Sequence, residues 1–100
     1  RNMSRAWIRT ITKYFEDFLE GEIGIEGFCA GYERWWNFDI PTDAELTGNE
    51  RVLLEKVFKV VTAYSPYDLE RNEITIYKSG EEVREIVEQV LSVLKNQNAA

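Results

Sequence analysis

The sequence has no histidine, a single cysteine and no long apolar run, and each absence excludes a class of function. Without histidine, the chain lacks the commonest general base at neutral pH and the commonest metal ligand. The lone Cys29 excludes internal disulfides, thiolate–histidine pairs and cysteine-rich zinc sites. No apolar stretch approaches the roughly twenty residues that a membrane-spanning helix needs. Any catalysis would therefore have to rest on carboxylates, and we predict a protein without enzymatic activity, cofactor or metal.

Basic residues are nearly missing from residues 16–50. This stretch has a net charge of −9, whereas residues 1–15 carry +4 and residues 51–100 carry −1, which together give the net charge of −6. The excess negative charge of residues 16–50 creates an electrostatic field that repels nucleic acid and anionic membranes and speeds the approach of a positively charged protein. Arg34 alone opposes the ten acidic residues of the stretch, which are Glu16, Asp17, Glu20, Glu22, Glu26, Glu33, Asp39, Asp43, Glu45 and Glu50.

The length of 100 residues predicts one domain, residues 1–100, with one core. An apolar content of 44% that includes 13% aromatic residues argues against disorder. The start of the sequence shows no basic and apolar leader pattern, and one cysteine gives no disulfide framework. We therefore expect a soluble, cytoplasmic globular protein.

Apolar residues recur at three- and four-residue spacing in four stretches, which predicts amphipathic helices over 4–19, 25–36, 49–64 and 79–95. Ser79 and Glu82 form a capping-box pattern at the start of the last one. Residues 37–48 predict a long loop, and residues 74–76 an extended connector. The expected fold is an all-α, antiparallel four-helix bundle with almost no strand, in which the helix over 49–64 is the most enclosed.

Three small residues of the second predicted helix bear on its packing. Gly27 and Gly31 lie four residues apart and share a face, which would let another helix approach closely. Cys29 lies on the apolar side and is predicted to be a small buried hydrophobic residue.

Two segments are candidate contact surfaces. Trp35 and Trp36 point about 100° apart on a helix, so one is expected in the core while the other either caps the bundle or anchors an interface beside the acids of the loop. The turn after Pro66 carries an exposed tyrosine and two acids, which are either solvated or in contact with a partner. The basic residues Arg1, Arg5, Arg9 and Lys13, and the acidic face of the last helix at Glu81, Glu85 and Glu88, are interpreted as solvated or internally paired.

A longer pattern spans most of the chain. It consists of residues 14–23 followed by Glu26 and Phe28, the predicted helix over 54–61, the turn 64–66 with Arg71, and the predicted helix over 82–87. The order and spacing of these segments resemble the colicin D-type immunity protein family. This family also includes immunity proteins of contact-dependent growth inhibition systems. The resemblance implies a helical bacteriocin-immunity type antitoxin that binds a toxin nuclease domain, often one that cuts tRNA. It also implies that acidic residues cover the basic active site of the toxin.

The resemblance further implies that the acidic patch lies at the end of the third helix and in the turn after it. In this sequence Thr62, Ser65 and Tyr67 stand in that stretch, so we expect the acids of the 37–50 loop to contribute as well. The expected assembly is a monomer in a 1:1 complex with a basic toxin domain, without nucleic acid or membrane contacts, although exposed aromatic residues could equally drive dimerisation. An acidic helical adaptor or chaperone for a basic partner is the alternative function. The residues expected to bind the toxin are Trp36, Asp39, Asp43, Glu45, Tyr67, Asp68 and Glu70.

Overall fold

The computed structural model describes residues 6–41, 46–65, 67 and 78–97. Within these residues the chain forms one π-helical turn and no strand; a single isolated bridge joins Tyr64 to Lys78. The π-helical turn, η2 (Trp35–Asp39), directly continues the second helix. The predicted all-α class is confirmed. The α-helices of the described part are α1 (Trp7–Leu19), α2 (Ile25–Arg34), α3 (Gly48–Thr62) and α5 (Gly80–Gln97).

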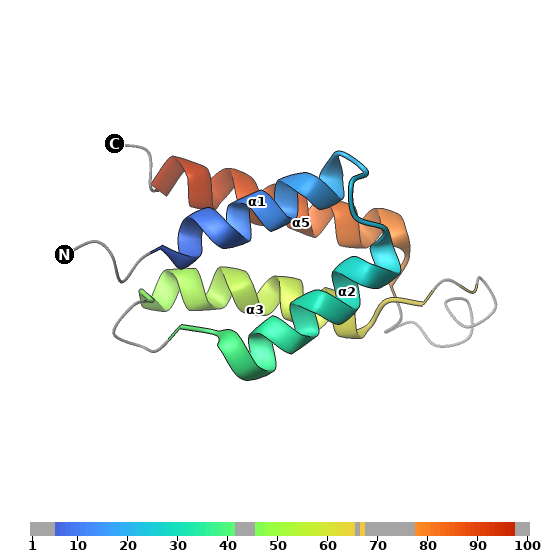
Figure 1. Cartoon of the computed structure of the whole chain (residues 1–100), viewed down its shortest axis with the longest axis horizontal. Coiled ribbons are helices and arrows are strands. Elements are labelled where there is room, and N and C mark those ends of the chain that lie inside the picture. Colours follow the sequence, from blue (N-terminus) through green and yellow to red (C-terminus); the bar gives the residue numbers. More distant parts are fainter. Residues whose placement is uncertain (1–5, 42–45, 66, 68–77, 98–100) are drawn as a thin grey trace.

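Successive helices run in opposite directions, as the colours of Figure 1 show. Helix α5 packs against both α1 and α3, and α2 packs against α3. Helix α3 was expected to be enclosed on most sides, but it packs mainly against α2 and α5, and Val52 on its outer side is 52% exposed. The apolar residues of α3 therefore exceed what its neighbours cover.

Aromatic side chains fill the space between α1 and α2. The ring of Phe28 stacks on Phe18 with the centroids 4.1 Å apart and on Tyr14 at 5.0 Å. Tyr32 is fully buried, and its hydroxyl donates a 2.7 Å hydrogen bond to the backbone carbonyl of Leu54 in α3. Because these side chains come from α1 and α2 and one of them bonds to the backbone of α3, the cluster fixes the position of α2 relative to both α1 and α3.

Capping boxes begin two of the helices. The predicted one is confirmed: the Glu82 amide donates to Ser79 Oγ at 3.2 Å, and the Ser79 amide donates to Glu82 Oε1 at 2.8 Å. A second box, which the sequence analysis missed, joins Thr47 and Glu50 at the start of α3. Glu50 is buried, with 3% of its surface exposed, so its carboxylate does not contribute to an acidic surface.

The predicted helix ends need three corrections. Helix α1 begins at Trp7, and residues 1–5 lie outside the described part. The loop expected from residue 37 begins later, because η2 extends α2 to Asp39. Helix α3 ends at Thr62, two residues before the predicted end.

Backbone hydrogen bonds join the two ends of the connection between α3 and α5. The Ser65 amide donates to the Lys78 carbonyl at 2.9 Å, and the Lys78 amide donates to the Ala63 carbonyl at 2.8 Å. The connector predicted over 74–76 lies outside the described residues. At the same end of the bundle, Arg84 of α5 donates a 2.6 Å hydrogen bond to the Leu19 carbonyl, which ties α5 to the end of α1.

Candidate functional site

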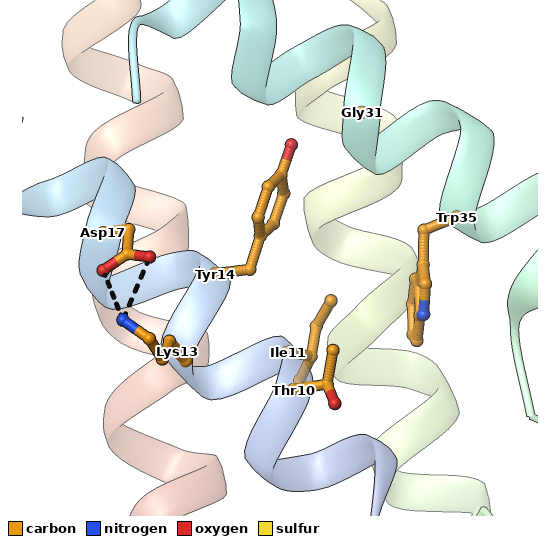
Figure 2. Close-up of a pocket in the computed structure, with 7 residues that line it drawn as sticks. All are labelled: Thr10, Ile11, Lys13, Tyr14, Asp17, Gly31 and Trp35. Carbon is orange, nitrogen blue, oxygen red and sulfur yellow. Dashed lines mark hydrogen bonds and ion pairs between the residues drawn. The ribbon is translucent and has the colours of Figure 1, made fainter. Parts of the chain in front are cut away.

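A groove lies between α1 and α2, with a volume of about 320 Å³ (Figure 2). One side is formed by Gly31 of α2 and Trp35 of η2, and its apolar floor includes Ile11 and Tyr14 of α1. We call this hollow the α1–α2 groove. The remaining lining residues are Thr10, Lys13 and Asp17, all on α1.

Tyr14 and Gly31 set the width of the α1–α2 groove. The Tyr14 hydroxyl donates a 3.0 Å hydrogen bond to the Phe28 carbonyl of α2, and a Cβ atom added at Gly31 would collide with that hydroxyl. A Cβ at Gly27 would meet only Ile23, at an ordinary 3.9 Å. The predicted close approach of another helix along both glycines is therefore found only at Gly31, and there the group that approaches is the Tyr14 side chain of α1. Burial of the Tyr14 ring raises the pKa of its hydroxyl.

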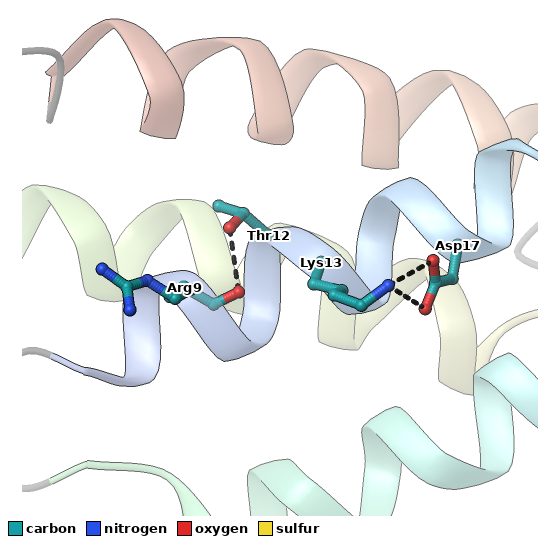
Figure 3. Close-up of polar contacts among 4 residues, drawn as sticks. All are labelled: Arg9, Thr12, Lys13 and Asp17. Atoms are coloured by element: carbon teal, nitrogen blue, oxygen red, sulfur yellow. Dashed lines mark hydrogen bonds and ion pairs between the residues drawn. The ribbon is translucent and has the colours of Figure 1, made fainter.

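The α1 edge of the groove is charged. Lys13 Nζ lies 3.1 Å from Asp17 Oδ1 one helical turn on, as Figure 3 shows, and this hydrogen bond raises the pKa of Lys13. Arg9 is exposed one turn before Lys13, and its carbonyl accepts a 3.1 Å hydrogen bond from Thr12. Of the predicted solvated or paired basic residues, Lys13 is paired and Arg9 is exposed, while Arg1 and Arg5 lie outside the described part.

The turn η2 holds both candidate tryptophans, and both are partly buried against the core. Trp35 packs on Tyr32 with the ring centroids 5.6 Å apart. Trp36 stacks on Phe58 of α3 at 5.0 Å, and the Arg51 guanidinium lies 5.8 Å from the Trp36 ring centroid. Trp36 is therefore engaged on α3 rather than standing free.

Phe38 is the residue that the sequence reasoning missed. It is 80% exposed, the largest exposed fraction among the large apolar side chains of the described residues. Asp39, which follows it, is also exposed. The sequence did contain a signal for its exposure. Trp35, Trp36 and Phe38 lie so close together in the chain that one face of a helix cannot bury all three rings.

The acidic residues gather most clearly around the turn between α1 and α2. Glu20, Glu22 and Glu26 are exposed, and none of the three forms an ion pair within the part of the chain that the structure describes. Gly21 has a φ of +88°, which only glycine adopts readily, and it allows the chain to reverse at this point. We call Glu20, Glu22 and Glu26 the acidic end. Glu16, by contrast, is paired with Lys95 of α5 at 2.7 Å.

Tyr67 lies at the same end of the bundle as these acids. It is 64% exposed, and its amide donates a 3.2 Å hydrogen bond to the buried Ser65. Gly80, the first residue of α5, lies close to two other elements at this end. A Cβ atom added to it would lie 3.1 Å from Ile25 of α2 and 3.9 Å from Tyr64, which follows α3. The first residues of α2 and α5 and the residues after α3 therefore meet there.

The seven residues predicted to bind a toxin do not form one described cluster. Trp36 and Asp39 lie together in η2, at the far end of α2 from the acidic end (Figure 1), whereas Tyr67 lies near the acidic end. Asp43, Glu45, Asp68 and Glu70 lie outside the described residues. The assignment of all seven remains a prediction.

Two further kinds of side chain bear on possible chemistry in the described residues, namely metal ligands and the thiol of Cys29. No group of three or more potential metal-ligating side chains is found among them. Cys29 is a buried hydrophobic residue, as predicted, with 7% of its surface exposed. Burial, together with the nearby Glu33 and Glu26, raises the pKa of its thiol to about 11, which keeps it protonated at neutral pH. Glu81, Glu85 and Glu88 are exposed, in agreement with the solvated face expected for α5.

Comparison with known proteins adds no further assignment, because no protein-family model, curated protein or solved structure matches this chain. In the described part of the chain, no helix has both the length and the apolar character required to cross a membrane.

Proposed function

We propose that this protein is an immunity protein that binds the basic nuclease domain of a cognate bacterial toxin and neutralises it without turnover. The single observation that carries the proposal is the acidic end, where Glu20, Glu22 and Glu26 are exposed and not neutralised by ion pairs with described residues. The exposed ring of Tyr67 stands at the same end.

These features suit the basic cleft of an RNA-cutting enzyme. Carboxylates present negative charge as RNA phosphates do, so they are attracted to the lysine and arginine side chains that bind the substrate. Such charges accelerate association, while an exposed tyrosine supplies apolar contact area with few rotatable bonds and slows dissociation. The resemblance of the sequence to colicin D-type immunity proteins adds the class of partner, a tRNA-cleaving toxin domain in the cytoplasm.

The test is co-expression with the protein encoded immediately upstream of this gene, with growth rescue and co-purification scored together. Rescue, and a tight complex that weakens as the salt concentration rises, are the expected results. A double variant, Glu22→Lys with Glu26→Lys, should lose most of the affinity. The matched control is Glu85→Lys with Glu88→Lys on α5, which alters the net charge equally and should still protect the cell.

Other outcomes would contradict the proposal in distinct ways. A complex that forms without growth rescue would favour an acidic adaptor or chaperone. Equal losses in both double variants would show that net charge matters and that the acidic end does not form the contact surface. Absence of both binding and rescue would exclude the protein encoded upstream as the partner.

A further inference from the structure

A second groove lies between α3 and α5, with a volume of about 690 Å³. None of its described lining residues belongs to α1 or α2, so it opens on the side of the bundle that α3 and α5 form. Its apolar floor consists of Val60, Ala63 and Ile86. Ala63 and Ile86 are partly exposed, so the described part of the chain leaves apolar surface uncovered here. We call this hollow the α3–α5 groove.

The apolar surface continues along both helices beyond the groove. Val52 lies one turn before Lys56 on the same side of α3, which is α-helical throughout Gly48–Thr62, and it is 52% exposed. On α5, Val93 lies two turns after Ile86 and is also only partly buried. Because α3 and α5 run in opposite directions (Figure 1), the two valines extend the apolar strip toward the same end.

The two edges of the α3–α5 groove carry opposite charges. Lys56 and Lys59 stand on the α3 edge, and Glu82 and Glu85 stand on the α5 edge. Glu82 is engaged within the chain, because it lies 4.0 Å from Lys78 and takes part in the capping box of α5. Lys56, Lys59 and Glu85 are exposed and form no ion pair with any described residue. The groove therefore separates opposite charges that do not neutralise each other within one chain.

This charge pattern indicates which partner the groove fits. A nucleic acid or another acidic ligand would be repelled by Glu85, and a basic protein would be repelled by Lys56 and Lys59. The groove instead fits a partner with an apolar strip between one basic edge and one acidic edge, and a second copy of the chain has that pattern. When a two-fold axis runs parallel to the helices, α3 of each copy lies against α5 of the other, so the lysine edge meets the glutamate edge twice.

We propose that two copies of this chain associate through their α3–α5 grooves, with Lys59 of each copy beside Glu85 of the other. The two apolar floors then face each other and are enclosed by four helices, as in the core of a helix bundle. The acidic end lies on α2 and on the turn before it, which contribute no described residue to this groove. The dimer thus does not depend on the proposed immunity function, and it replaces the expected monomer in a 1:1 complex by a dimer that binds one toxin domain per chain.

The first test is sedimentation velocity of the purified chain, without any toxin, over a wide concentration range. The expected result is a concentration-dependent species with twice the 11.7 kDa mass of the chain. Lys59→Glu should raise the dissociation constant at least about tenfold, because the two-fold arrangement creates the like-charge contact twice. Arg9→Glu is the matched control, since it makes the same change in charge at an exposed position of α1 and should leave association unchanged.

The sharpest test mixes two variants that each associate weakly alone. Glu85→Lys should weaken the dimer as Lys59→Glu does, whereas Glu22→Lys at the acidic end should not. In an equal mixture of the Lys59→Glu and Glu85→Lys chains, the two introduced charges attract each other and the two native ones form the second contact. A tag on one variant should therefore co-purify the other, at close to wild-type affinity. Pairing within a single chain could not produce this rescue, because each variant still carries like charges on both edges.

A further variant tests the apolar strip. Val52→Ser should raise the dissociation constant about tenfold, as expected when an apolar side chain loses its burial in an interface. Phe38→Ser is the control, because it removes an apolar ring that is 80% exposed in η2 and takes no part in the α3–α5 groove. Circular dichroism of each variant shows whether the fold is kept.

Three results would overturn the proposal. One is a wild-type chain that is monomeric at every concentration. Another is an equal effect of Lys59→Glu and Arg9→Glu on association, which would show that net charge matters and the α3 edge does not. The third is a mixture of folded Lys59→Glu and Glu85→Lys chains that fails to form the mixed dimer, since that would show that these two positions do not meet across an interface.

Discussion

The hydroxyl of Tyr14 occupies the space that a side chain at position 31 would require. A Cβ atom on Gly31 would collide with this hydroxyl and would also lie 3.3 Å from the Tyr14 ring carbon that bears it. The hydroxyl cannot move freely, because it donates a 3.0 Å hydrogen bond to the Phe28 carbonyl and its ring stacks on Phe28. The spacing between α1 and α2 therefore depends on the absence of a side chain at position 31.

Gly31→Ala should destabilise the protein by about 1–3 kcal/mol, the usual cost of overpacking a closely packed site. The added methyl group would force Tyr14 away from α2, which breaks its hydrogen bond and disturbs the ring contact with Phe28. Urea unfolding followed by circular dichroism measures the change in the free energy of unfolding.

Gly27→Ala is the control for this prediction. It adds the same methyl group in the same helix but meets only Ile23, at 3.9 Å, so the better helix propensity of alanine should stabilise the protein by up to about 1 kcal/mol. Adding Tyr14→Phe to Gly31→Ala should recover part of the loss. A Gly31→Ala protein as stable as wild type would refute the steric role of this glycine.

The helix packing shows how far the sequence alone can be taken. The four-residue spacing of Gly27 and Gly31 predicted close approach along a shared face, but of the two only Gly31 has a close neighbour. It could not identify the approaching residue, because that depends on how Tyr14, on a different helix, is aimed by the ring of Phe28. Periodicity specifies which side of a helix is buried, whereas the partner across an interface is set by the tertiary arrangement.

Tyr32→Phe should lower the free energy of unfolding by about 0.5–1.5 kcal/mol, the usual net value of one buried hydrogen bond. The substitution removes the 2.7 Å bond to the Leu54 carbonyl while it keeps the ring in the core. Tyr67→Phe removes a hydroxyl from an exposed ring and should change stability by less than about 0.5 kcal/mol. Equal stabilities of the two variants in thermal or urea unfolding would refute the contribution of the Tyr32 hydroxyl.

The candidate contact residues were harder to predict than the helices. Trp36 was identified as a possible anchor from its residue type, but its stacking on Phe58 and its contact with Arg51 involve side chains at least fifteen positions away in the sequence. Phe38 was overlooked although it closely follows the tryptophan pair, because the spacing of apolar residues does not show that the helix widens into η2 at this point. Side-chain exposure at a helix end depends on which neighbours have already filled the core.

Thr47→Ala and Ser79→Ala should each destabilise the protein by about 1 kcal/mol, because each removes the side-chain acceptor of a capping box. Thr47→Ala should have the larger effect, since Glu50 in that box is buried and Glu82 is exposed. Thr47→Ser keeps the hydroxyl and should restore most of the loss in urea unfolding. Thr47 and Glu50 have the same spacing as Ser79 and Glu82, so this box was recognisable in the sequence.

The buried thiol of Cys29 should make stability depend on pH in the alkaline range. Its pKa is raised by burial, followed by Glu33 and Glu26, from the usual 9.0 to about 11 in the folded protein. Between these two pH values the unfolded chain releases the thiol proton while the folded chain keeps it. The stabilisation is therefore complete below pH 9 and is lost as the pH rises toward 11.

A shift of this size corresponds to a loss of up to about 3 kcal/mol across the window. The hydroxyls of Tyr32, which is buried, and Tyr14, which is partly buried, also have raised pKa values because of burial, and they add to the decline of stability at high pH. Cys29→Ala separates the contributions, since it keeps both tyrosines and removes only the thiol. The unfolding free energies of wild type and Cys29→Ala should converge as the pH rises from 9 to 11. Parallel curves would show that the thiol ionises equally in both states, in contradiction to its burial between α2 and the core.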